Sequence, residues 1–380
     1  MKPRLALVGA FPFPVPQGSQ VYFADQARAL RALGAEVTLF VHGRGAGPLP
    51  GDLNVIVAPA ALSPRRLRAG PSLLKPLADA ALARRLASEA GRRPFDALLA
   101  HNAEAALLGL AARARIGAPV VYVAHALWRH ELPAYGPAAA AGLLARAGAA
   151  LDRSLARRCD AILTLCASAR DALEPLARGP VALIPPGLAP GPPPDPESLG
   201  AACARHGLEP GRFALYAGNL DAYQSLPVLA GAADRAPGIP FVVATHDARG
   251  AAPEPLRIVE TQSPAEVRAL TWAAGVCLLP RVIPGGFPIK LLNYMEAGRP
   301  IVALRSVADG FEDGRSALLL ADGAGDAAWA EAVTRVMNDA ALARHLGEEA
   351  RALLLRRHAW PALAEATLDL VARARQAAAP

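Results

Sequence analysis

The 380-residue sequence has only four cysteines, no long apolar run and no recognisable leader. The cysteines (Cys159, Cys166, Cys203 and Cys277) have neither Cys-x-x-Cys nor Cys/His spacing, so neither a zinc site nor a disulfide framework is indicated. Residues 1–20 lack the apolar core of a signal peptide, and no apolar run reaches the roughly 18 residues that a membrane span needs. These absences predict a soluble protein of the reducing cytoplasm.

Aromatic residues are also scarce, at 5% of the chain, and no nucleic-acid-binding motif occurs. We therefore expect no nucleic-acid partner, although the net charge is +7. That charge lies in the first half: residues 1–185 hold 22 Lys+Arg against 12 Asp+Glu, whereas residues 186–380 hold 18 against 21. A basic half of this kind suits an acidic substrate or an anionic membrane surface.

Short apolar runs alternate with amphipathic stretches along the chain, which predicts an α/β fold with parallel sheets. The runs expected to form strands are residues 5–10, 37–41, 55–57, 97–100, 120–123, 161–165, 213–217, 241–244, 276–279 and 301–304. The stretches expected to form helices are residues 20–33, 73–91, 104–115, 138–158, 167–177, 225–236, 264–274 and 288–297.

The length and one proline-rich segment predict two Rossmann-like domains, because single cores stop growing at roughly 250–300 residues. The segment from Pro185 to Pro196 reads as a semi-rigid connector. The expected domains are residues 1–185 and 186–359, with a tail helix at 360–376 that crosses back to the first domain. Their sheets would face each other across a cleft lined by the carboxyl ends of the strands.

Two features of the first half bring polar groups to that cleft. A loop after the first strand ends in Gly18, which permits close backbone approach, and Ser19, which can cap the next helix. His101 and His125 each follow a predicted strand directly, so both imidazoles could meet a substrate. An ordinary connecting loop and two structural histidines are the alternatives. The loop after the first predicted strand lacks the Gly-x-Gly-x-x-Gly fingerprint, which argues against a dehydrogenase.

In the second half, a glycine pair precedes one of the three lysines of the chain. Gly285 and Gly286 leave backbone amides bare, Pro288 suits a first helical turn, and Lys290 would lie in that turn. Bare amides, a helix start and a cation together suit a diphosphate. The alternative is a plain Gly-Pro turn before a helix.

These residues resemble the donor-binding segment of family-4-type retaining glycosyltransferases of GT-B fold (glycosyl transferases group 1). The resemblance is carried by the run from Gly286 to Val302, by Tyr216-Ala-Gly-Asn, by Ile184-Pro-Pro-Gly and by His125 after its strand. It implies a hexosyltransferase-type enzyme that moves a sugar from a UDP- or GDP-linked donor to an acceptor hydroxyl, with no other cofactor. Retention is implied as well, and the lack of an Asp-x-Asp motif agrees with an implied metal independence.

The sequence departs from the family pattern at four positions. Gly285 and Asn293 stand where two glutamates are usual, and Asn219 and Gln224 stand where an arginine and a lysine clamp the donor diphosphate. Lys290, together with Arg281, could supply the missing positive charge. The residues expected to bind the donor are Gly18, Gly218, Asn219, Gln224, Arg281, Gly285, Gly286, Phe287, Pro288, Ile289 and Asn293.

The resulting hypothesis gives His125 and Lys290 the catalytic roles. Lys290 would stabilise the departing diphosphate, and His125 would contact the donor sugar or its cationic centre. The residues expected on the acceptor side are Ser19, His101, Trp128, Arg129 and Glu131. Two rivals remain open: a non-catalytic homologue that binds a nucleotide or glycan as a partner subunit, and a nucleotide-sugar epimerase of the same fold.

Residues 63–93 carry eight Lys+Arg against two acids. Leu73, Leu74, Leu77, Leu82 and Leu86 could form an apolar face beside this charge. A basic amphipathic stretch predicts peripheral binding to anionic lipid on the inner face of the cell membrane and a lipid-linked or membrane-borne acceptor. The alternatives are a solvated helix face in an arginine-rich protein and an acidic glycan as partner.

Overall fold

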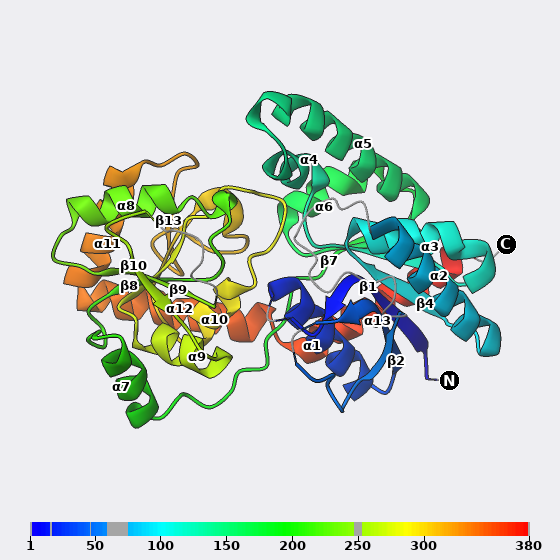
Figure 1. The fold of residues 1–380 in the computed structure, drawn as a ribbon, viewed down its shortest axis with the longest axis horizontal. Coiled ribbons are helices and arrows are strands. Elements are labelled where there is room, and N and C mark those ends of the chain that lie inside the picture. The colour runs from blue at the N-terminus through cyan, green and yellow to red at the C-terminus, as the bar shows by residue number, and fades with distance from the viewer. Residues whose placement is uncertain (1, 16, 46, 59–74, 247–252, 379–380) are drawn as a thin grey trace. The chain divides into compact units, whose positions relative to one another are not determined.

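The computed structural model describes residues 2–15, 17–45, 47–58, 75–246 and 253–378 (Figure 1). The chain divides into two compact units. Unit 1 contains the chain up to Gly187, the short segment Pro284–Phe287 and the tail from Trp360, and unit 2 contains Leu188–Ile283 and Pro288–Ala359. Residues 284–287, which we had placed in the second domain with the rest of 186–359, therefore group with unit 1.

Unit 1 is built on a seven-stranded sheet in which every recorded pairing is parallel. The spatial order is β3-β2-β1-β4-β5-β6-β7. The strands are β1 (Arg4–Phe13), β2 (Glu36–Arg44), β3 (Asn54–Val57), β4 (Ala97–His101), β5 (Val120–Ala124), β6 (Ala161–Thr164) and β7 (Val181–Leu183). The central strands β4 and β5 are apolar throughout except at His101 and are fully buried, as expected of parallel strands covered on both faces.

Two groups of helices cover this sheet (Figure 1). The helices are α1 (Gly18–Ala32), α2 (Lys75–Arg92), α3 (Asn102–Ile116), α4 (Trp128–Glu131), α5 (Ala141–Arg158), α6 (Ala167–Leu173) and α13 (Trp360–Ala378). Helices α2, α3 and α5 contribute to one large core cluster with the sheet. The tail helix α13 packs against α1 and contacts β5 and β6.

Helix α2 does not offer the apolar face that a membrane-binding stretch needs. Leu82 and Leu86 are completely buried in the core cluster, whereas Leu77 is 55% exposed. Leu73 and Leu74 lie outside the described residues. The prediction of a free apolar face is therefore wrong for Leu82 and Leu86, because that side of the helix packs on the sheet.

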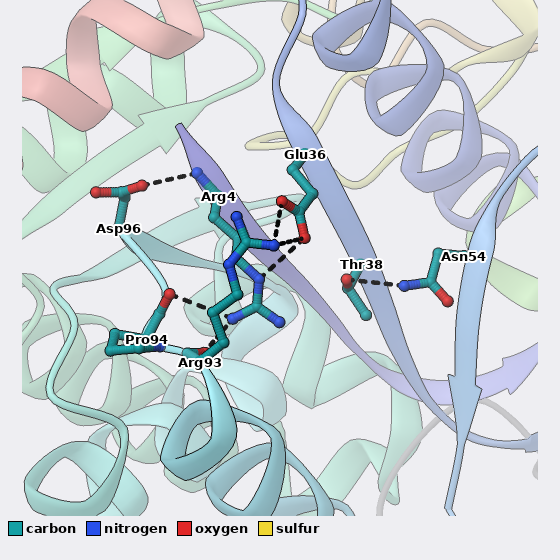
Figure 2. Close-up of polar contacts among 7 residues, drawn as sticks. All are labelled: Arg4, Glu36, Thr38, Asn54, Arg93, Pro94 and Asp96. Atoms are coloured by element: carbon teal, nitrogen blue, oxygen red, sulfur yellow. Dashed lines mark hydrogen bonds and ion pairs between the residues drawn. The ribbon is translucent and has the colours of Figure 1, made fainter. Parts of the chain in front are cut away.

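Charged residues tie the strand beginnings of unit 1 together (Figure 2). Arg4, at the start of β1, pairs with Glu36 at the start of β2 over 3.1 Å, and Arg93 reaches the same carboxylate over 2.7 Å. The backbone N–H of Arg4 donates to Asp96 over 2.7 Å, and Arg375 of α13 pairs with Asp96 as well. This cluster lies at the amino ends of the strands, so it supports the fold away from the strand ends that bind ligands in such sheets.

Unit 2 repeats the arrangement with six parallel strands in the order β10-β9-β8-β11-β12-β13. The strands are β8 (Ala214–Ala217), β9 (Phe241–Thr245), β10 (Arg257–Glu260), β11 (Val276–Leu279), β12 (Ile301–Leu304) and β13 (Leu318–Leu320). The helices are α7 (Pro196–Arg205), α8 (Leu226–Arg235), α9 (Pro264–Ala273), α10 (Lys290–Glu296), α11 (Asp326–Asn338) and α12 (Ala340–Arg357).

In both sheets the chain winds outward in one direction from the first strand and then continues on the other side of that strand. The reversal falls between β1 and β4 in unit 1 and between β8 and β11 in unit 2. Loops leave the carboxyl ends of these strands in opposite directions, and ligands of open α/β sheets bind in the resulting crevice. The predicted fold class of two parallel, Rossmann-like sheets is confirmed.

Candidate functional site

In unit 1 the two predicted histidines lie side by side at the sheet reversal. His101 is the last residue of β4 and His125 follows the end of the neighbouring strand β5, so both leave the sheet at the same edge. Nδ1 of His101 lies 3.0 Å from Nε2 of His125. His101 is fully buried and His125 is half-buried. The sequence spacing alone could suggest this proximity, but not a direct hydrogen bond.

This imidazole pair is neutral at physiological pH. Burial lowers the pKa of His101 well below its ordinary value, and the adjacent His125 lowers it further. Burial also lowers the pKa of His125 to about 4. The buried Nε2 of His101 has no hydrogen-bond partner among the described residues. A buried N–H without an acceptor costs roughly 1–3 kcal/mol, so we assign the hydrogen of His101 to Nδ1, from which it is donated to His125. His125 then keeps its own hydrogen on Nδ1.

Aromatic side chains surround the pair and were not predicted as site residues. The Tyr22 ring of α1 lies edge-on to His125 with centroids 5.5 Å apart, and it stacks on Trp360 of α13 at 5.8 Å. Phe23 meets His101 edge-on at 4.7 Å. These contacts fix the imidazole planes and produce the burial that keeps both rings neutral.

The predicted acceptor-side residues follow His125 in the short helix α4. Asp152, a fully buried residue of α5, accepts hydrogen bonds from the backbone N–H groups of Trp128 and Arg129 and from Nε of Arg129. Glu131 accepts a hydrogen bond from the Tyr135 hydroxyl over 3.1 Å. Asp152 therefore anchors this segment and neutralises Arg129, a role that sequence spacing of 24 residues did not indicate.

The predicted cap at the start of α1 is wrong. We expected Ser19 to cap a helix that begins near Gln20, but α1 begins at Gly18, and Gln17 occupies the capping position without a side-chain hydrogen bond. The cause lies in β1, which pairs with β2 as far as Phe13 and so shortens the connecting loop. Ser19 consequently lies inside the first helical turn.

In unit 2 the centre of the candidate site is Lys290, the first residue of α10, as predicted. Its Nζ donates to the Tyr216 hydroxyl over 2.8 Å and to Oε1 of Gln224 over 3.5 Å. Nζ also lies 3.9 Å from the centre of the Tyr216 ring. Gly218 has φ of 154°, and a Cβ there would collide with Nζ, so only glycine leaves room for the ammonium. The Gly218 amide donates to the Ala244 carbonyl, so this residue supplies space and no free donor.

Asn219 and Gln224, where the resemblance implies two cations, form part of this network. Nε2 of the buried Gln224 donates to Oδ1 of Asn219 over 3.0 Å, and Nδ2 of Asn219 donates to the Tyr223 hydroxyl over 3.2 Å and to Asp221. The Tyr216 hydroxyl donates to the Asn219 carbonyl over 2.7 Å. Asn219 and Gln224 therefore hold neighbouring side chains in place without adding charge.

Burial removes much of the water that would otherwise solvate the Lys290 ammonium. Burial lowers the pKa of its ammonium well below the ordinary value, the Arg281 guanidinium lowers it further, and Asp221 opposes both effects. Arg281 is fixed by a 3.0 Å bond from Nε to the Ile283 carbonyl, with its guanidinium 5.3 Å from the Tyr223 ring centre. An anion that binds beside Lys290 would raise the pKa of its ammonium again, because an opposite charge favours the protonated form.

The predicted donor residues Asn293 and Ile289 lie in and just before α10. Asn293 is exposed on α10, and Ile289 precedes that helix. The N–H groups of Leu291 and Leu292 donate to the Pro288 and Ile289 carbonyls, so they are already engaged. Those two first-turn amides are therefore not free to bind a diphosphate.

Gly285, Gly286 and Phe287 belong to the short segment that groups with unit 1. A Cβ on Gly286 would come within 2.6 Å of the His125 carbonyl oxygen. Gly285 adopts φ of 82°, which favours glycine, so both glycines permit this segment to lie close to the turn that carries His125. The segment therefore brings the predicted glycine pair to the histidine, a proximity that the sequence did not reveal.

The described residues include neither a cluster of metal ligands nor a helix that could span a membrane. No three His, Cys, Asp or Glu side chains in the described ranges are grouped so that they could hold a metal ion. No helix among them is both long and apolar enough to cross a bilayer.

Each unit has a parallel sheet with polar residues at its reversal, and the six strands of unit 2 repeat the order of the first six strands of unit 1. Residues 16–190 match the Glycosyltransferase Family 4 model, and residues 216–339 match Glycosyl transferases group 1. The chain therefore belongs to these glycosyltransferases, as the sequence resemblance predicted, and it is a glycosyltransferase enzyme.

Solved structures share the fold at low sequence identity. Sucrose-phosphate synthase from Thermosynechococcus elongatus has a TM-score of 0.81 at 17% identity, covering 99% of this chain and 100% of that one. HepE from Anabaena in complex with UDP-glucose has a TM-score of 0.72 at 14% identity, covering 97% and 99%. WaaG, a glycosyltransferase involved in lipopolysaccharide biosynthesis, has a TM-score of 0.66 at 15% identity, covering 97% of this chain and 99% of that one. No curated protein sequence matches the chain.

Proposed function

We propose that the enzyme transfers a sugar from a nucleotide-diphosphate sugar to an acceptor hydroxyl, and that unit 2 holds the donor diphosphate through Lys290. The single observation that carries this proposal is the partly buried ammonium of Lys290, fixed by Tyr216 and Gln224. A cation held in place before the reaction stabilises the charge that develops on a departing diphosphate without the cost of reorienting water. The UDP-glucose complex of HepE supports a UDP-linked donor.

His125 contacts the donor sugar in this proposal. Its neutral ring, with the hydrogen assigned to Nδ1, can donate one hydrogen bond to a sugar hydroxyl while Nε2 is occupied by His101. Transfer then needs no nucleophile from the enzyme, no metal ion and no cofactor, and it proceeds with retention of configuration. The segment from Trp128 to Glu131, held by Asp152, contacts the acceptor.

A glycan or lipid-linked acceptor suits the basic first half of the chain, and the printed role of WaaG in lipopolysaccharide synthesis supports this choice. Binding to the inner face of an anionic membrane then rests on charge rather than on an apolar face of α2, whose Leu82 and Leu86 are buried.

The test is a donor panel of UDP- and GDP-linked sugars, assayed for nucleotide release with and without candidate glycan acceptors. We expect one donor to be turned over, faster when an acceptor is present, and without loss of rate in the presence of a chelator. Binding of nucleotide with no turnover of any sugar donor would favour the non-catalytic homologue. Conversion of the sugar without an acceptor would favour the epimerase.

A further inference from the structure

A cavity in unit 2 lies at the edge of the sheet opposite the Lys290 group. It has a volume of about 510 Å³. Gly275 lines it just before β11, and Pro300 lines it just before β12, so it opens at the amino ends of these strands. Lys290 and Gly218 stand at the carboxyl ends of the same sheet. The cavity is therefore distinct from the proposed donor site.

Three arginines line this cavity, which we call the arginine cavity: Arg299, Arg344 and Arg351. Arg344 and Arg351 lie seven residues apart on α12, so they project from the same face of that helix. Glu348 is the one carboxylate residue among the lining residues, and it makes no recorded ion pair with any of the three. The lining therefore carries an excess of two positive charges in a concave site.

Arg299 supplies a second and independent observation. Its Nε is buried and has no hydrogen-bond partner among the described residues. Burial lowers the pKa of this guanidinium, which shows that its charge is poorly solvated. A poorly solvated charge without a partner destabilises the folded chain. An anion in the arginine cavity would offset that cost by neutralising the guanidinium.

The position of Arg351 is also partly fixed. Its guanidinium carbon lies 5.7 Å from the Trp272 ring centre, within the range of a cation–π contact. Such a contact orients the guanidinium while leaving its N–H edge available. Planar guanidinium groups bind phosphate through two parallel hydrogen bonds, a geometry that lysine cannot supply.

We propose that the arginine cavity binds a small phosphate-bearing molecule. The volume falls in the range of small-molecule sites, which is roughly 300–1,000 Å³, and it accommodates a sugar phosphate as well as inorganic phosphate or pyrophosphate. The shared chemistry is the phosphate group, held by Arg299, Arg344 and Arg351. This proposal does not depend on the proposed transfer reaction.

The test is a calorimetric titration of inorganic pyrophosphate into the full-length Lys290→Ala variant, in which the proposed donor contact is removed. We expect one binding event, weakened about tenfold or more when Arg351→Gln is added. Arg356→Gln is the matched control, because Arg356 is exposed on the same helix and does not line the cavity. It should leave the affinity unchanged. Arg299→Lys keeps the charge but loses the fork, and it should weaken binding as well.

Parallel titrations identify the source of the phosphate. Tighter binding of a hexose 1-phosphate than of pyrophosphate assigns the arginine cavity to sugar phosphates, and the reverse order assigns it to inorganic anions. Citrate, a carboxylate of similar charge, should bind at least tenfold more weakly. Binding of citrate equal to that of pyrophosphate would overturn the phosphate assignment. Absence of pyrophosphate binding at millimolar concentration, or binding that survives both Arg351→Gln and Arg299→Lys, would overturn the site itself.

Discussion

The sheet reversals of units 1 and 2 have the same topology but differ in charge: the first is neutral and the second is positive. In unit 1 two neutral imidazoles share a hydrogen bond inside an aromatic shell. In unit 2 a lysine ammonium is held by a hydroxyl and an amide, with a guanidinium close enough to lower its pKa. A strand order therefore fixes where a ligand binds, whereas the side chains after the strands decide which part of the ligand is recognised.

The comparison also explains how this chain departs from its relatives. Asn219 and Gln224 stand at the positions where the family resemblance implies two cations, and both are engaged in hydrogen bonds around Lys290. One lysine, with Arg281 beside it, carries the positive charge of the unit 2 reversal.

The largest effect is expected from removing that charge. Lys290→Ala should reduce kcat/KM by about 2–5 kcal/mol in transition-state stabilisation, which is roughly 30- to 5,000-fold. Steady-state kinetics with the accepted donor measures this effect. Lys2→Ala is the matched control, because Lys2 is an exposed lysine of unit 1. A Lys290→Ala enzyme with near-normal kcat/KM would remove the distinction between the two reversals.

The neutral histidines of unit 1 should appear in the pH dependence of stability. The pKa of His125 is about 4 in the folded chain and about 6.5 when unfolded, so between these values the unfolded chain binds more protons. The free energy of unfolding should therefore fall as the pH drops from 7 to 4, with His125 contributing about 3 kcal/mol of the decrease.

Urea unfolding at several pH values measures this decrease. In His125→Asn the fall should be smaller than in the wild type, while nucleotide affinity stays close to that of the wild type and kcat is depressed. An unchanged pH profile in the variant would mean that folding does not lower the pKa of His125. Collapsed nucleotide binding would instead make His125 a donor anchor.

A smaller effect is expected at Tyr216, whose hydroxyl accepts from Lys290 and donates to the Asn219 carbonyl. Tyr216→Phe keeps the ring beneath the ammonium and removes one neutral hydrogen bond, worth roughly 0.5–1.5 kcal/mol, and one from a charged donor, worth roughly 1.5–3 kcal/mol. We expect a modest rise in the KM for the donor with the fold intact. A loss of activity as large as that of Lys290→Ala would show that the hydroxyl itself takes part in the reaction.

The smallest effect is expected at Asn293. This residue is exposed on α10, and exposed substitutions usually change stability or binding by no more than about 0.5 kcal/mol. Asn293→Ala should therefore leave kcat/KM within about twofold of the wild type. A larger loss would restore Asn293 to the donor-binding role that the family resemblance implies.

The sequence was sufficient to predict the parallel sheets, the place of Lys290 in the first turn of α10 and the two histidines at strand ends. Each depends on local pattern: apolar runs, a Gly-Gly-Phe-Pro turn, and a polar residue directly after a buried strand. The strands β7, β10 and β13, each of which lies at an edge of its sheet, were missed.

Contacts between distant segments could not be predicted in the same way. Trp360 stacks on Tyr22 from a helix at the far end of the chain, and Asp152 anchors residues 24 positions earlier. An aromatic or acidic residue on an amphipathic helix carries no local sign of such a partner. The misplaced cap at Ser19 has a related cause, because the length of β1 is set by its pairing with β2.

The central claim is that the unit 2 reversal binds the donor diphosphate through Lys290. Calorimetric titration of UDP and GDP into the wild type and into Lys290→Ala tests it most directly. Because Lys290 is the cation that Tyr216 and Gln224 hold at this reversal, we predict that one of the two nucleotides binds the wild type and that Lys290→Ala loses most of that affinity. Equal affinity of the two proteins for that nucleotide would contradict the assignment.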